Sequence, residues 1–307
     1  MSLGQKYLPA VALIGVTVVW GSSFFLIRDL VHTIAPLDFL GLRFAIAALV
    51  IGAVRCRPLI RSTRRTWGRG IILGLVWTGA QIFQTYALSV GSASAVGVVT
   101  GMYVVLTPLI LFLACRMRLS ARVWAASALA MTGLVVLSYQ GWSFGGGESL
   151  ALVGAFLYAV HIVLLGRWSP KENGLDLAAI QTITLALVLG PLALPGGVTL
   201  PQTLQQWGVL MYMALVAGVG ALYIQTWAQA HIASTAAAVI MTTEPVFAAA
   251  FAVGLGGETL TLRLLAGGGM IVAAMMINEL GGASTVSRAS GHSGGRPRSS
   301  WTRTRRR

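Results

Sequence analysis

The sequence has little charge and very few acidic residues. Charged residues make up 10% of the 307 residues, and only 8 of these are Asp or Glu, whereas 56% of the chain is hydrophobic and the mean hydropathy is +0.79. A water-soluble domain of this length needs more polar surface, so the composition excludes one. We therefore expect an integral membrane protein with almost no mass outside the bilayer.

Cysteines, paired carboxylates and nucleotide-binding motifs are also scarce. Cys56 and Cys115 fall at predicted cytoplasmic helix ends, where thiols stay reduced, and their spacing fits no metal site. No Gly-x-x-x-x-Gly-Lys-Ser/Thr motif is present to predict an ATP site, and the eight carboxylates are scattered without paired spacing. We expect neither an enzyme nor a bound metal or cofactor.

Ten apolar stretches in the chain are long enough to cross a bilayer as helices. They cover residues 8–27, 37–54, 70–88, 94–114, 121–139, 149–166, 175–194, 207–227, 233–254 and 261–280. The sequence thus predicts an all-α membrane protein with ten transmembrane helices.

The two halves of the chain look duplicated. The run Gln-Thr-Tyr-Ala at 84–87 returns as Gln-Thr-Trp-Ala at 225–228, 141 residues later. Each copy holds five spans, and an odd number turns the second copy upside down in the membrane. We expect two inverted five-helix repeats around a central cavity, at residues 1–140 and 141–280, followed by a tail at 281–307.

A second offset aligns polar residues of the two copies. An offset of 138 maps Asp38 onto Asp176 and Arg43 onto Gln181. The duplication therefore extends beyond the apolar stretches to residues that carry charge or hydrogen bonds.

The basic residues predict the orientation of the chain. Nineteen of the 22 Lys and Arg residues fall in segments expected on one side, and only Arg28, Arg43 and Arg263 fall on the other. By the positive-inside rule both termini are cytoplasmic, so the net charge of +14 does not indicate a nucleic-acid partner. The Gly-, Ser- and Arg-rich tail is expected to be disordered, and it either lies on anionic lipid or has no role.

Polar residues recur at helical spacing within the third span. They are Gly74, Trp77, Thr78, Gln81, Gln84 and Thr85. Such a stripe either lines a wet cavity or packs one helix against another through small residues and amides. The repetition of the 84–87 run in the second copy favours the cavity.

Two ionisable residues are expected deep in the membrane. Glu244 falls halfway along the ninth span, directly before Pro245, where a bare carboxylate costs at least about 2.5 kcal/mol. Two interpretations are open. In the first, Glu244 has a function and either exchanges a proton or binds an ammonium group of a substrate; in the second, it is a neutral structural residue. His161 has the same two interpretations, substrate or proton binding against a satisfied interhelical hydrogen bond.

Three further charged residues are expected near the outer face. Arg43, at the start of the second span, needs a carboxylate there, and Asp38 and Glu258 are the available ones. The resulting bridge is interpreted either as an outer gate or as a static brace.

These motifs together resemble a known family, the EamA-like ten-helix permeases of the drug/metabolite transporter superfamily. The resemblance covers about residues 8 to 280. It is carried by Trp-Gly-Ser-Ser-Phe at 20–24, Pro36 followed by Arg43-Phe44, Gly-Met-Tyr-Val-Val-Leu-Thr-Pro at 101–108, Glu-Pro-Val-Phe at 244–247 and Gly257-Glu258.

The resemblance implies a multi-pass permease of the inner membrane that exports small organic metabolites, such as amino acids and related amphipathic compounds, by alternating access. It places nine residues on the substrate path: Trp20, Ser23, Trp77, Gln81, Tyr103, Tyr158, His161, Gln225 and Glu244. Proton coupling through Glu244 or His161 is one expectation and an uncoupled facilitator another. A lipid-handling membrane enzyme or a scaffold is the alternative from a different class.

Overall fold

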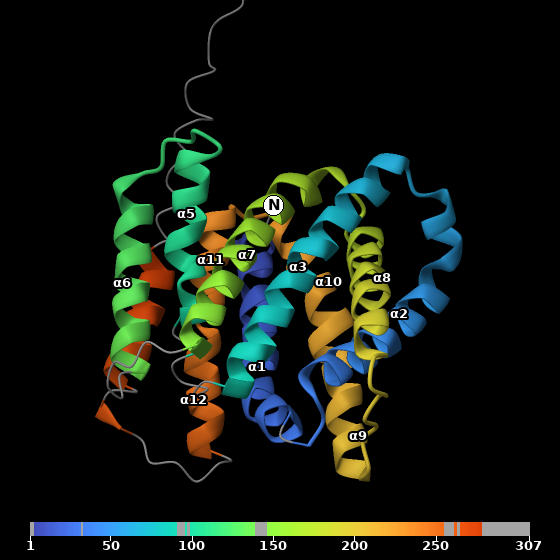
Figure 1. Cartoon of the computed structure of the whole chain (residues 1–307). Coiled ribbons are helices and arrows are strands. Elements are labelled where there is room, and N and C mark those ends of the chain that lie inside the picture. The colour runs from blue at the N-terminus through green and yellow to red at the C-terminus, as the bar shows by residue number, and fades with distance from the viewer. Residues whose placement is uncertain are drawn as a thin grey trace, which may run out of the picture.

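The computed structural model describes residues 3–31, 33–90, 96, 99–138, 146–254, 261–262 and 265–277. Nearly all of these residues are helical, and no strand occurs among them. The all-α fold predicted from the sequence is therefore confirmed. Figure 1 shows most of the helices running between the same two ends of the molecule. Glu258, Arg263 and the tail at 281–307 lie outside the described residues.

The helices follow the expected spans, with longer first, second and third helices. The first half contains α1 (Leu3–Val31), α2 (Pro36–Arg61), α3 (Arg64–Val90), α5 (Tyr103–Leu113) and α6 (Ala121–Ser138). The second half contains α7 (Gly146–Trp168), η1 (Ser169–Lys171), α8 (Gly174–Ala193), α9 (Leu204–Met211), the π-helical segment η2 (Tyr212–Gly220), α10 (Ala221–Gln229), α11 (Ser234–Met241), α12 (Glu244–Gly254) and a last helix, Leu265–Ile277.

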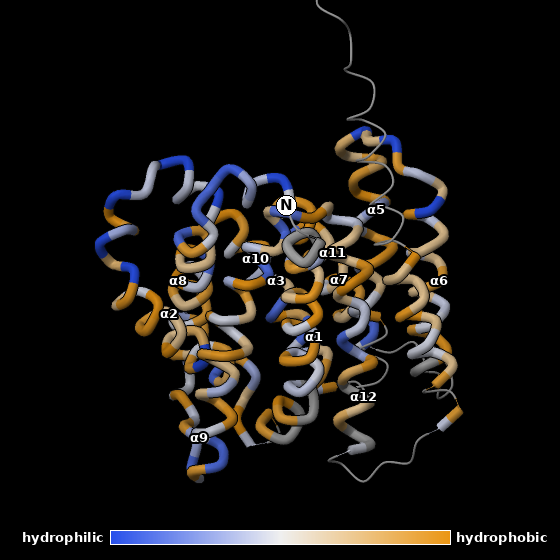
Figure 2. Tube along the Cα trace, turned by 180° about the vertical axis from the view of Figure 1, so that it is seen from behind, coloured by the Kyte–Doolittle hydropathy of each residue, from blue (hydrophilic) through white to orange (hydrophobic). Residues whose placement is uncertain are grey.

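Within the described residues, five helices are long and apolar enough to cross a membrane, and four shorter apolar helices accompany them. The count of ten spans stays a prediction. Large apolar side chains such as Leu49, Ile60 and Leu204 are at least 74% exposed, which suits contact with lipid. Figure 2 shows apolar residues along the helices, while hydrophilic residues gather in the links at one end. The chain is a multi-pass membrane protein.

One end of the molecule is basic. The links α2–α3, α5–α6 and α7–α8 lie at the same end as the N-terminus, at the top of Figure 1. These links and the adjoining helix ends contain Arg55, Arg57, Arg61, Arg64, Arg65, Arg69, Arg116, Arg118, Arg122, Arg167 and Lys171. We call this the basic end; the links α1–α2 and α8–α9 lie at the opposite end.

The repeat-related helices α2 and α8 pack antiparallel. Near the start of α2, a Cβ added to Gly41 would lie 2.9 Å from the Cβ of Ala193, the last residue of α8. Near the other end of α2, Arg55 reaches Asp176 in the first turn of α8. Antiparallel packing of equivalent helices is the arrangement expected of inverted repeats.

Two glycines let α3 approach α8 closely. A Cβ added to Gly70 would lie 2.5 Å from Cγ2 of Ile180, and one added to Gly74 would lie 2.6 Å from Cβ of Thr184. Small residues four positions apart allow such contact between membrane helices. Gly74, expected in the polar stripe, therefore serves helix packing.

Candidate functional site

A central cavity lies between the two halves of the chain. All nine residues that the sequence placed on the substrate path line it: Trp20 and Ser23 of α1, Trp77 and Gln81 of α3, Tyr103 of α5, Tyr158 and His161 of α7, Gln225 of α10 and Glu244 of α12. The lining also includes Ile27, Arg43, Gln84, Leu88, Thr100, Ile162, Met213 and Met241. Aromatic, amide and charged side chains thus converge from helices far apart in the sequence.

Along α1 and α3 the lining of the cavity runs from the middle of the molecule toward the end opposite the basic end. Helix α3 begins at the basic end with Arg64, yet its lining residues run from Trp77 near its middle to Leu88 near its far end. The lining residues of α1, from Trp20 to Ile27, likewise lie in the half of the helix farther from the N-terminus.

The expected polar stripe of the third span divides between two roles. Trp77, Gln81 and Gln84 line the cavity. The hydroxyl of Thr78 instead donates to its own helix, at 2.7 Å from the carbonyl oxygen of Gly74. The cavity interpretation therefore fits Trp77, Gln81 and Gln84, whereas Gly74, which packs against Thr184 of α8, fits the packing interpretation.

A chain of hydrogen bonds orders one wall of the cavity. The Tyr158 hydroxyl donates to Oε1 of Gln84 at 2.6 Å and accepts from Nε2 of Gln81 at 2.9 Å. The second amide atom of Gln81, Oε1, lies 3.5 Å from Nη1 of Arg43. These contacts join α2, α3 and α7 and hold the phenol and the amides in defined orientations.

Arg43 lies in the cavity wall and does not bridge to Asp38, while Glu258 lies outside the described residues. It is seven residues beyond Pro36 at the start of α2, which is about 10 Å at 1.5 Å per residue. Its Nε donates to the carbonyl oxygen of Met213 at 3.0 Å, while Asp38 accepts a hydrogen bond from the backbone N–H of Thr199 at 2.9 Å. The expected local bridge between Asp38 and Arg43 is therefore wrong, because each has a different partner.

Sequence reasoning missed Arg43 as a lining residue because it counted the position as a helix end. The available signal was the 138 offset, which pairs Arg43 with Gln181 inside α8.

Glu244 stands at a break between two helices. Helix α11 ends at Met241, Thr242 and Thr243 form a turn, and α12 begins with Glu244. Pro245 therefore lies in a first helical turn, where a missing N–H removes no helical hydrogen bond, and not in a helix interior as expected. Discontinuous helices at membrane depth are tolerated where they line a cavity, and they often form transporter sites.

Aromatic rings form another part of the wall. Trp77 and His161 stack with ring centroids 5.9 Å apart and 23° between their planes. His161 Nε2 is 2.7 Å from Oε1 of Gln181, so this histidine has an interhelical hydrogen bond as well as a place on the cavity.

The π-helical segment η2 is bonded to the first half through its carbonyl groups. Arg43 Nε bonds to Met213, and Trp20 Nε1 donates to the carbonyl oxygen of Ala217 at 2.9 Å. Single π-helical turns are frequent at functional sites. The sequence predicted an ordinary helix here, and no pattern in it signalled the change.

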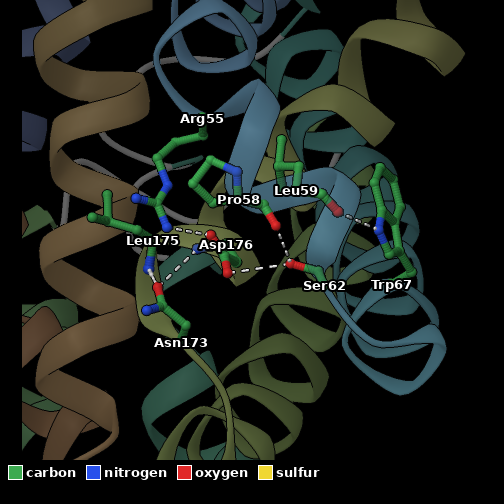
Figure 3. A network of polar contacts seen from close by, with 8 residues as sticks. All are labelled: Arg55, Pro58, Leu59, Ser62, Trp67, Asn173, Leu175 and Asp176. Atoms are coloured by element: carbon green, nitrogen blue, oxygen red, sulfur yellow. Dashed lines mark hydrogen bonds and ion pairs between the residues drawn. The ribbon is translucent and has the colours of Figure 1, made fainter.

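The basic end is closed by contacts between the halves, shown in Figure 3. Arg55 Nη2 lies 2.5 Å from Oδ1 of Asp176, and the Ser62 hydroxyl donates to Oδ2 of the same residue at 3.2 Å. The side chain of Asn173 caps α8 by accepting from the N–H groups of Leu175 and Asp176, which holds the aspartate in the first turn.

A second ion pair lies beside the first. Arg69 Nη1 is 2.5 Å from Oε1 of Glu172, and the hydroxyl of Thr66 donates to Oε2 at 2.7 Å. Both ion pairs join α2 or α3 of the first half to residues around the start of α8. They hold the two halves together at the basic end.

A helical membrane protein with a polar cavity between two repeated halves is typical of secondary transporters. The sequence pattern of the EamA-like transporter family matches residues 8–139 and again residues 145–279. The chain therefore belongs to the EamA-like transporter family.

Several curated relatives carry transporter names. An "Uncharacterized transporter" of Archaeoglobus fulgidus is 28% identical over 86% of this chain and 83% of the relative. The "Uncharacterized inner membrane transporter YedA" of Escherichia coli K12 is 26% identical over 88% of this chain and 90% of the relative. A "Probable amino-acid metabolite efflux pump" of Salmonella typhimurium is 29% identical over 87% of this chain and 93% of the relative.

The fold is also similar to a solved crystal structure. That structure superimposes with a TM-score of 0.75 at 18% identity, over 94% of this chain and 99% of the other. At this identity the likeness concerns the fold alone.

Proposed function

We propose that the protein is a secondary transporter that exports small organic metabolites, such as amino acids or related amphipathic compounds, across the inner membrane. The observation that carries this proposal is the central cavity, to which both halves contribute aromatic, amide and charged side chains. Apolar walls with a few converging polar groups suit small organic solutes better than bare ions. The relative named as an amino-acid metabolite efflux pump supports the same solute class and direction.

We propose alternating access as the mechanism, and the unequal ends support it. The basic end faces the cytoplasm by the positive-inside rule, so both termini are cytoplasmic and the cavity extends toward the outside. Two repeats of five helices, at 1–140 and 141–280, rock about their interface, and the ion pairs of Arg55 and Arg69 must break when the cavity opens inward.

Glu244 and His161 are the groups that would couple transport to protons. Glu244 has no hydrogen-bond partner among the described residues and faces the cavity, whereas His161 is already bonded to Gln181. Glu244 is therefore the better candidate. A facilitator without coupling is the first alternative, and a non-transport protein, either a lipid-handling enzyme or a scaffold acting through its tail, is the second.

The test is flux in proteoliposomes with an imposed pH gradient. A labelled panel of amino acids and related metabolites is offered to the native protein, to Glu244→Gln and to Glu148→Gln, a matched control in the first turn of α7 that does not line the cavity. Saturable, gradient-driven flux that is lost only in Glu244→Gln supports coupled transport.

Each alternative has its own result. Equal flux with and without the gradient, retained in Glu244→Gln, identifies a facilitator. No flux for any solute contradicts transport, and deletion of residues 281–307 then tests the scaffold alternative by its phenotype.

A further inference from the structure

Arg43 is a buried cation without an anionic partner in the part of the chain that the structure describes. Its side chain is 4% exposed, and the ion pairs found among the described residues involve Arg55 and Arg69 instead. A charged residue inside a membrane protein is costly and usually faces a partner, a carbonyl group or a substrate path.

The contacts that Arg43 does make hold it in place without neutralising it. Its Nε bonds to the carbonyl oxygen of Met213 at 3.0 Å, and Nη1 reaches Oε1 of Gln81 only at 3.5 Å. The guanidinium carbon also lies 4.9 Å from the centre of the Phe44 ring. A guanidinium group has five N–H donors, so several remain for a ligand in the cavity that Arg43 lines.

The second half of the chain supplies acceptors to the same cavity. Gln225 donates through Nε2 to Sδ of Met241 at 3.6 Å, and its Oε1 is buried without a hydrogen-bond partner. Met241 precedes the helix break at which Glu244 stands, so an amide oxygen and a carboxylate lie on neighbouring parts of the wall. The phenol of Tyr158 lies within electrostatic range of both Arg43 and Glu244.

The two halves of the chain therefore contribute different polar groups to the cavity. Arg43, from the first half, contributes a cationic donor to the lining, and Gln225 and Glu244, from the second half, contribute an unpaired amide oxygen and a carboxyl group. Aromatic rings of both halves, Trp77 among them, complete the lining.

We propose that Arg43 binds a carboxylate of the transported solute, and that an amine on the solute points toward Glu244. This inference rests on the proposed function and adds the group that the site recognises. The planar fork of an arginine matches a carboxylate through two parallel hydrogen bonds, which a lysine does not reproduce. A solute without an acid group would leave the guanidinium unpaired in a low-dielectric site.

The test compares matched solutes that differ in one group. Leucine carries both groups, leucinamide lacks the carboxylate, and 4-methylpentanoate lacks the amine; phenylalanine, phenylalaninamide and 3-phenylpropionate form a second set. Binding to purified protein in nanodiscs is measured by competition for the native chain, Arg43→Gln and Arg43→Lys. Arg57→Gln, an exposed arginine outside the cavity, is the matched control.

We expect the native protein to bind the amino acid about 10- to 100-fold more tightly than its amide, the range for a hydrogen-bonded charge. Arg43→Gln should abolish that preference while leaving the affinity for the amide nearly unchanged. Arg43→Lys should keep part of the preference, and Arg57→Gln should keep all of it.

Three results would overturn the inference or separate it from the proposed function. Equal preference for the acid in native protein and Arg43→Gln removes Arg43 as the acid-binding residue and leaves transport intact. Native protein that binds amides as tightly as acids contradicts the inference even if Arg43→Gln does not fold. If native protein neither binds nor transports any member of either set, the proposed solute class fails first.

Discussion

The two ends of the α2–α8 pair each hold an aspartate, and the two aspartates have different partners. Asp38, near the start of α2, accepts one hydrogen bond from the backbone N–H of Thr199. Asp176, its counterpart at an offset of 138, pairs with Arg55 and accepts from Ser62 near the start of α8. Both aspartates connect one half of the chain to the other, but among the described residues Asp176 alone does so through an opposite charge.

This difference shows that the described contacts hold the two ends by different groups. Duplication supplies equivalent positions, and Arg55 of α2 and Arg69 of α3 form ion pairs at the basic end. At the other end Gly196 and Gly197, with φ of 94° and 88°, allow the turn that brings the backbone N–H of Thr199 to Asp38. The cavity extends toward the end that a neutral donor holds.

The repeats differ in the same way inside the membrane. Arg43 lines the cavity, whereas its counterpart Gln181 is fully buried and bonds to His161 and to the carbonyl oxygen of Leu177. One copy thus uses the position for the cavity and the other uses it to hold a histidine.

Removing both ion pairs should have the largest effect on this comparison. In the double variant Glu172→Gln/Asp176→Asn, Arg69 and Arg55 lose their charged partners. The side chain of Glu172 is 8% exposed and that of Asp176 is 13% exposed. We expect the free energy needed to open the basic end to fall by about 2–4 kcal/mol, a value that already allows for the partial exposure of the ion pairs. Hydrogen exchange measured by mass spectrometry should then accelerate in segments 60–70 and 170–180. Unchanged exchange there would show that helix packing alone closes this end.

Filling the close contact between α3 and α8 should have the next largest effect. Gly70→Ala places a methyl group against Ile180, whereas Gly68→Ala, in the same helix, meets nothing within 4 Å. We expect Gly70→Ala to destabilise the protein by about 1–3 kcal/mol and Gly68→Ala to be neutral or slightly stabilising. Thermal unfolding in detergent checks the difference. Equal melting temperatures for the two variants would mean that α3 and α8 move apart to admit the methyl group at little cost in free energy.

Neutralising one aspartate should act at the basic end alone. Asp176→Asn leaves Arg55 without a charged partner, and we expect a loss of about 1–2 kcal/mol. A double-mutant cycle with Arg55→Gln, followed by thermal unfolding, should show that the two losses are not additive. Strict additivity would indicate that the pair contributes nothing beyond its separate residues.

The same substitution at the opposite end should have the smallest effect. Asp38→Asn keeps an oxygen that accepts from the Thr199 N–H, so we expect a change within about 0.5 kcal/mol. Its melting temperature is compared with that of Asp176→Asn under the same conditions. A loss equal to that of Asp176→Asn would remove the distinction between the two ends.

The sequence by itself determined the membrane class, the duplication and the helical content. Those properties depend on hydropathy and local periodicity, because a helix in a bilayer satisfies its own backbone hydrogen bonds. The nine residues found on the cavity could also be predicted from the sequence. Gln81 and Tyr158, for example, lie in the middle of expected spans, and the family resemblance places them on the substrate path. Their part in solute binding remains a prediction.

Only the tertiary structure decided what depends on contacts between distant residues. The ion pair of Arg55 and Asp176 spans 121 positions, and the bond from Arg43 to Met213 spans 170, so no local pattern predicts either. The helix break before Glu244 and the π-helical segment η2 likewise depart from a regular α-helix. Such departures are tolerated inside a membrane protein where the backbone lies against neighbouring helices or a cavity. Periodicity places a residue on a face of its helix, and only packing decides what that face meets.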